Sequence, residues 1–152
     1  MKRRIFWATL VLLVGLQFVR PARNVSTISH EPNEVTALYP TPPAVKAILA
    51  RACYDCHSDT TRYPWYADLQ PVGWWLSHHV EEGKRHLNFS QFGKYDAKRA
   101  IRKLKQVVDQ TSEHEMPLAS YLLIHRDAAL SDADLAAIED WAQTVRERVA
   151  TQ

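Results

Sequence analysis

The sequence has few cysteines, methionines and glycines. Its 152 residues include two cysteines, two methionines and four glycines, and no stretch alternates apolar and polar residues in the manner of a half-buried strand. We therefore expect an all-α fold. The chain contains no internal repeat and no low-complexity tract, and its length suits one domain with its own core.

The sequence also lacks an excess of charge of one sign. Its 19 Lys and Arg residues are interspersed with 17 Asp and Glu residues, which leaves a net charge of +2. Proteins that bind nucleic acid concentrate basic residues on one face or along one helix. We therefore expect no nucleic-acid partner.

The first 21 residues predict export from the cytoplasm. Basic residues 2–4 precede residues 5–19, which carry no charge, and this is the pattern of a signal or membrane-anchor segment. A buried helix of a cytosolic protein is the alternative, which the leading basic cluster disfavours. A helix of this run spans about 22 Å, less than the roughly 30 Å of a bilayer core. Arg20 and Pro21 stand where a cleavage site needs small residues, which favours an uncleaved anchor on the periplasmic side of the inner membrane, with release after cleavage as the alternative.

The rest of the chain divides into a linker and a domain. Residues 22–43 contain four of the eight prolines and show no helical period, which indicates a Pro-containing linker. In the domain, 44–152, apolar spacing predicts a helix from residue 44 into the cysteine motif and further helices over 71–82 and 96–111. Ser131 with Asp134 resembles a capping box and predicts the start of the last helix.

Both cysteines lie in one motif, Cys53-Tyr-Asp-Cys56-His57. On a helical turn, positions i, i+3 and i+4 project from one face, so the two thiols and the imidazole can hold one planar ligand. Cys-x-x-Cys-His is the attachment signature of c-type haem, in which the sulfurs form thioethers and the histidine is an axial ligand of the iron. We therefore expect one covalent haem c with its iron.

Three other interpretations of the motif stay open. The first is a disulfide or a thioredoxin-like redox pair, in which the histidine would have no function. A thioredoxin-like pair would also need a βαβ unit, which this sequence does not show. A zinc site needs another closely spaced pair of ligands, and the sequence has no second Cys-x-x-Cys. Two structural cysteines beside a surface histidine are the third alternative.

Met116 is our candidate for the distal iron ligand. It precedes Pro117 in a predicted loop, and the only other methionine is Met1. A thioether ligand raises the reduction potential and leaves no open position, as an electron carrier requires. A core-filling methionine is the alternative. His79, in the predicted helix 71–82 with Trp74 and Trp75, is the second choice for the distal ligand. Arg51 and Arg62 are candidate partners for the haem propionates.

The sequence resembles the bacterial haem-binding-domain family of small mono-haem c-type cytochromes. The similarity rests on "CYDCHSDTTRYPWYADLQPVGWWLSHHVEEGKRHLNFSQF" and "EMPLASYLLIHRDAALSDADLAAIEDW". It implies a cytochrome c-like helical domain, thioether bonds at Cys53 and Cys56, His57 as the proximal ligand and Met116 as the distal one. The sequence departs from ordinary class I cytochromes in its first helix, where Ala44 and Ile48 replace the glycine and aromatic residue of the helix crossing.

These observations predict a mono-haem c-type cytochrome that transfers single electrons between redox partner proteins at the periplasmic face of the membrane. We expect an electron carrier and not an enzyme. The alternative is a haem-based sensor or a peroxidase, in which Met116 is displaceable or His79 or His114 acts on the distal side. A haem-bearing subunit of a larger membrane complex would differ only in its partners.

Overall fold

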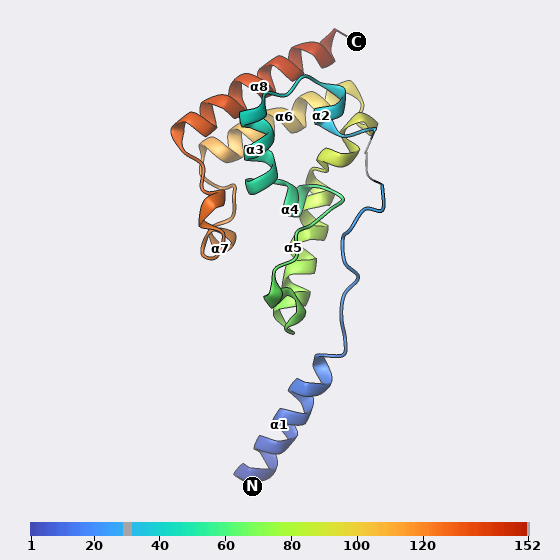
Figure 1. Cartoon of the computed structure of the whole chain (residues 1–152), viewed down its shortest axis with the longest axis vertical. Helices are drawn as coiled ribbons and strands as arrows, with labels where there is room; N and C mark the ends of the chain where they lie inside the picture. Colours follow the sequence, from blue (N-terminus) through green and yellow to red (C-terminus); the bar gives the residue numbers. More distant parts are fainter. Residues whose placement is uncertain (29–31, 152) are drawn as a thin grey trace.

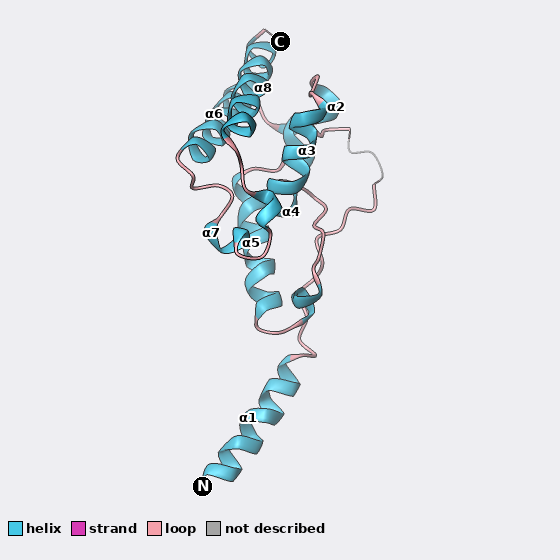
Figure 2. Cartoon of the chain, turned by 60° about the vertical axis from the view of Figure 1, so that its left-hand side comes forward, coloured by secondary structure: helices cyan, strands magenta, loops and turns pink. Residues whose placement is uncertain are grey.

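The computed structural model describes residues 1–28 and 32–151, and over these residues it contains helices and no strand, as predicted (Figure 2). The α-helices are α1 (Lys2–Leu16), α2 (Val35–Leu38), α3 (Pro43–Ala52), α4 (Tyr54–His57), α5 (Val72–His86), α6 (Ala97–Ser112), α7 (Ala119–Leu122) and α8 (Asp132–Ala150). Three 3₁₀ helices join them: η1 (Trp65–Asp68), η2 (Phe89–Lys94) and η3 (Arg126–Ala128).

The domain is built around the pair α6 and α8, against which α3 packs (Figure 1). Beneath this layer lie α4 and α5, which contact each other. Helix α1 extends away from the domain, and only its C-terminal end lies near the lower end of α5 (Figures 1 and 2). The apolar stripes that predicted these helices face inward. The core side chains of α3, α6 and α8 are Val45, Ile48, Leu49, Ala100, Leu104, Ile138, Trp141, Ala142, Val145 and Val149.

Local signals set the helix boundaries. The capping box predicted for the last helix is present, with Ser131 Oγ accepting from the amide of Asp134 at 3.2 Å and the Asp134 carboxylate accepting from the amide of Ser131 at 2.9 Å. Helix α5 runs four residues beyond the predicted end at Glu82. The basic residues of this extra turn suit a helix C-terminus, where they oppose the helix dipole.

The N-terminal apolar segment forms α1, and none of its side chains is buried. No helix in the described parts of the chain combines the length and the apolar character needed to cross a membrane.

The segment predicted as a linker, 22–43, contributes to the folded core. Val35 of α2 is fully buried, and the Tyr39 ring meets the Phe92 ring edge-on with centroids 6.1 Å apart. The proline content of the segment predicted a linker without contacts to the domain, but α2 packs on η2, and the Gly93 amide donates to the Asn33 carbonyl at 2.9 Å. Residues 29–31 of this segment lie outside the described residues.

Helix α5 approaches the cysteine motif closely at Gly83. A Cβ atom built there would lie 2.5 Å from the carbonyl oxygen of Cys56 in α4. At the positions expected for the helix crossing, Ala44 is exposed and Ile48 is buried. Only a glycine at position 83 lets α5 press against the cysteine motif.

Candidate functional site

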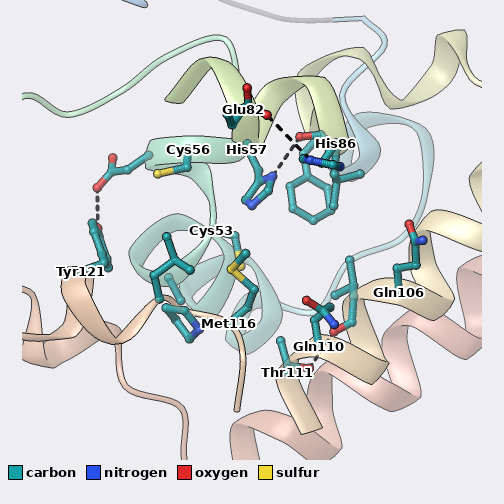
Figure 3. A pocket seen from close by; sticks show the side chains of 18 of the residues that line it. Cys53, Cys56, His57, Glu82, His86, Gln106, Gln110, Thr111, Met116 and Tyr121 are labelled. Carbon is teal, nitrogen blue, oxygen red and sulfur yellow. Dashed lines mark hydrogen bonds and ion pairs between the residues drawn. The ribbon is translucent and has the colours of Figure 1, made fainter. Parts of the chain in front are cut away.

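A cavity of about 680 Å³ lies between the cysteine motif, α5, α6 and the loop that follows α6. Its lining includes all five side chains predicted for the site: Cys53, Cys56, His57, His79 and Met116. In Figure 3, Cys56 and His57 lie on one side of the opening and Met116 on the other, together with Gln110 and Thr111 of α6. Cys53 and Met116, which are 63 positions apart in the sequence, are thus brought to one site.

The imidazole of His57 is fixed in one tautomer. Its Nδ1 lies 3.0 Å from the carbonyl oxygen of Leu87, just beyond α5. Because a carbonyl can only accept, Nδ1 carries the proton and the lone pair is on Nε2. Burial lowers the pKa of His57, so the ring is neutral at physiological pH. A neutral imidazole with its second nitrogen hydrogen-bonded to a carbonyl is the form that ligates metals.

The two cysteines are free and partly buried. Burial raises the pKa of the Cys53 thiol to about 12 and that of Cys56 to about 11. Both are therefore protonated at neutral pH, whereas thiol exchange and zinc binding use thiolates. In the described part of the chain, no three or more His, Cys, Asp and Glu side chains are grouped to hold a metal ion.

Met116 reaches the cavity because of the turn that ends α6. His114 adopts a left-handed backbone conformation, with φ of 58°. Its amide bonds to the carbonyl of Thr111, and the amides of Glu115 and Met116 both bond to the carbonyl of Gln110. This is a Schellman motif, which reverses the chain direction at a helix end. Met116 follows directly and lines the cavity.

His79 also lines the cavity, from α5. Its Nδ1 is 2.9 Å from the carbonyl oxygen of Trp75, and the centroids of the Trp75 and His79 rings are 4.1 Å apart. As at His57, donation from Nδ1 leaves the lone pair on Nε2. The structure therefore places both candidates for the distal ligand at the same cavity.

Sequence reasoning missed a polar network at the cavity wall. The carboxylate of Asp55, between the two cysteines, accepts from the Tyr121 hydroxyl at 2.7 Å. It also accepts from three nitrogens of Arg62, the backbone amide and two of the guanidinium group, each at 3.1 Å. Tyr121 in turn stacks on His125, with ring centroids 4.2 Å apart. No local pattern could reveal this network, because Asp55 and Tyr121 are 66 residues apart.

The two arginines expected to meet propionates are engaged elsewhere. Arg51 forms an ion pair with Asp134 at 2.8 Å, and Arg62 is held by Asp55. Lys103 of α6 lines the cavity instead, with its Nζ 3.1 Å from Oε1 of Gln106. It is the only Lys or Arg among the described residues that line this cavity.

The fold and site define a helical domain with a cavity whose wall carries thiol, imidazole and thioether groups. A sequence model of the haem-binding domain matches residues 11–144. The chain belongs to the haem-binding domain family, as the resemblance of its motifs indicated. No curated protein and no solved structure matches it.

Proposed function

We propose that this protein is a mono-haem c-type cytochrome that transfers single electrons at the periplasmic face of the membrane. The observation that carries the proposal is the meeting of Cys53, Cys56, His57 and Met116 at one cavity. The family supports haem as the ligand, and the residues fit it. A bound haem would supply one-electron chemistry between the ferrous and ferric states of its iron.

Cys53 and Cys56 would hold the haem through thioether bonds. Both thiols line the cavity, and both are protonated at neutral pH because burial raises the pKa of each. His57 would be the proximal ligand through Nε2. Its bond to the Leu87 carbonyl orients the ring and increases its basicity, as the outer partners of metal-bound histidines do.

Met116 would be the distal ligand. A thioether sulfur favours the ferrous state, and a filled sixth position suits electron transfer without ligand binding. Lys103 would pair with a haem propionate, since a carboxylate at the cavity mouth needs a cation or a hydrogen-bond donor. The Asp55–Tyr121 bond holds the chain after Met116 against the cysteine motif.

The proposed location rests on the N-terminal segment. Basic residues 2–4 would stay on the cytoplasmic side, and the apolar surface of α1 would anchor the chain, with the folded domain in the periplasm. The partners would be redox proteins at that face. We propose no enzymatic activity and no nucleic-acid partner for the principal function.

A haem-based sensor or peroxidase is the second candidate. The observation in its favour is His79, which lines the same cavity with its Nε2 lone pair free. If His79 lay on the distal side, it could exchange a proton with a bound molecule.

The test is spectroscopic and uses the full chain, exported and haem-loaded. Acid-acetone should leave the haem on the wild-type chain and extract it from a Cys53→Ala, Cys56→Ala variant. The ferric protein should show the weak near-infrared band of methionine-to-iron charge transfer, and Met116→Ala should lose the band and bind carbon monoxide. Haem retention by the double variant would contradict covalent attachment. A low-spin spectrum without the band would favour His79, and a high-spin spectrum would favour the sensor or peroxidase.

A further inference from the structure

The end of the domain beside α1 carries a group of exposed apolar side chains. We call them the anchor-proximal patch: Phe18, Val19, Leu69, Val72 and Trp75. The stretch 65–75, from which the last three come, contains one charged residue, Asp68. A water-facing surface of this composition is a candidate for contact with a partner.

The chain holds this patch at the end of α1. The Gln17 side chain, one residue after α1, donates to the Gln70 carbonyl at 3.2 Å and accepts from the Gln70 amide at 2.9 Å. The Trp74 indole N–H donates to the Val19 carbonyl at 2.8 Å. Both views place the start of α5 next to the C-terminal end of α1 (Figures 1 and 2).

Further contacts continue this attachment along the segment after α1. Asp68 pairs with Arg23 at 2.7 Å and with Arg20 at 3.3 Å. The Asn24 side chain donates to the Ser58 carbonyl at 2.9 Å. The connection from α1 to the domain is therefore a fixed contact, which holds the patch and α1 in one orientation.

The length of α1 indicates what covers the patch. Its 15 residues span about 22 Å, roughly 8 Å less than the hydrocarbon core of a bilayer. Apolar protein surfaces enter the interfacial region of a bilayer by about 5–10 Å, and tryptophan is enriched there. If the patch enters the interfacial region to this depth, its thickness adds to the length of α1, and together they match the thickness of the hydrocarbon core.

The charges at this end agree with a lipid partner. Arg20 and Arg23 both pair with the carboxylate of Asp68, so these three residues together carry a net positive charge beside the patch. That charge favours anionic headgroups at the level where the patch would meet them.

We propose that the anchor-proximal patch rests in the interface of the lipid bilayer that holds α1, so that the domain has a fixed orientation on the membrane. This inference rests on the proposed membrane anchoring, not on the haem chemistry. The mouth of the cavity is then presented to redox partners from a constant direction, and contacts at 17–24 set that direction.

The experiment uses full-length holoprotein in vesicles of phosphatidylethanolamine and phosphatidylglycerol. An environment-sensitive fluorophore is attached in turn to three variants: Leu69→Cys in the patch, Val11→Cys in α1, and Ile124→Cys after α7. Ile124 is a matched control, because it is also apolar and exposed (65% against 48% for Leu69) but lies on a different part of the domain. Lipid-borne nitroxide and aqueous iodide then serve as quenchers.

We expect the nitroxide to quench the labels at positions 11 and 69 and iodide to quench the label at 124. If iodide quenches the label at position 69 as it does at 124, while nitroxide still quenches the label at 11, the patch does not lie in the bilayer interface. That result would overturn this proposal and leave the proposed anchoring by α1 intact. Iodide quenching at all three positions would overturn both. The haem absorption spectrum of the same samples reports independently on the proposed function.

Discussion

The hydroxyl of Tyr121 donates a 2.7 Å hydrogen bond to the carboxylate of Asp55, the middle residue of the cysteine motif. Asp55 is buried, and besides Tyr121 it accepts from Arg62. The bond joins the two chain segments that meet at the cavity, the one with both cysteines and the one that follows Met116.

Tyr121→Phe removes only this hydroxyl, and we expect it to destabilise the holoprotein. A hydrogen bond to a charged group contributes about 1.5–3 kcal/mol, and the buried carboxylate would lose one of its donors. Urea unfolding, followed through the haem absorption, measures the change. Tyr66→Phe is the control, because its hydroxyl is hydrogen-bonded to the ring of His125 and not to a carboxylate. Equal losses in the two variants would contradict a special role for the Asp55 bond.

Gly83→Ala tests the close contact of α5 with the cysteine motif. Alanine favours a helix by about 1 kcal/mol over glycine, but here its Cβ would lie 2.5 Å from the Cys56 carbonyl oxygen. Because that atom belongs to the backbone, α4 must shift, and we expect a loss of about 1–3 kcal/mol in stability. Displacement of α4 should also lower the yield of covalent haem per chain, measured as pyridine haemochrome.

Gly15→Ala is the matched control for this substitution. Gly15 lies in α1, and an added Cβ there would meet no atom within 4 Å. Its haem yield should equal that of wild type. A Gly83→Ala variant with normal haem yield and normal stability would show that α4 has room to move.

His114→Gly should stabilise the protein, because the Cβ atom of His114 is sterically strained in the left-handed backbone conformation. Its φ of 58° suits glycine, and relief of the strain contributes up to about 1 kcal/mol. Glu113→Gly, at the neighbouring position with a φ of −81°, should destabilise instead, since glycine there only adds backbone freedom to the unfolded chain. Thermal unfolding of the two variants gives the comparison. A loss of stability in His114→Gly would mean that the side chain itself is needed.

Sequence reasoning succeeded where the interactions are local. The capping box at Ser131 and Asp134 spans four residues, and the apolar stripe of α8 is visible from its spacing, so both were predicted. The contacts that shape the cavity are not local. His57 meets a carbonyl 30 residues away, and Asp55 meets a hydroxyl 66 residues away. Val35 gave no periodic signal, so its burial depends on a partner surface that only the fold assembles.

The acid dependence of stability should reveal the contacts of Asp134. Hydrogen bonds from the amide and hydroxyl of Ser131, with the nearby Arg51 guanidinium, hold the pKa of this carboxyl below its usual value. A lowered folded-state pKa adds stability that is fully present above the unfolded pKa, about 3.9, and is lost as the pH falls through the folded pKa.

Asp134→Asn should therefore be less stable than wild type at pH 7, by about 0.5–2 kcal/mol, the usual contribution of a helix cap. The difference should begin to shrink as the pH falls below about 4, where the carboxyl group of the unfolded chain takes up a proton, and it should be lost once the pH is below the lowered pKa of the folded state. Urea unfolding at a series of pH values measures both. Asp132→Asn removes a carboxylate from the same helical turn that makes none of these bonds, so it controls for net charge. A difference that is constant from pH 7 to pH 2 would mean that Asp134 acts through its shape and not through its charge.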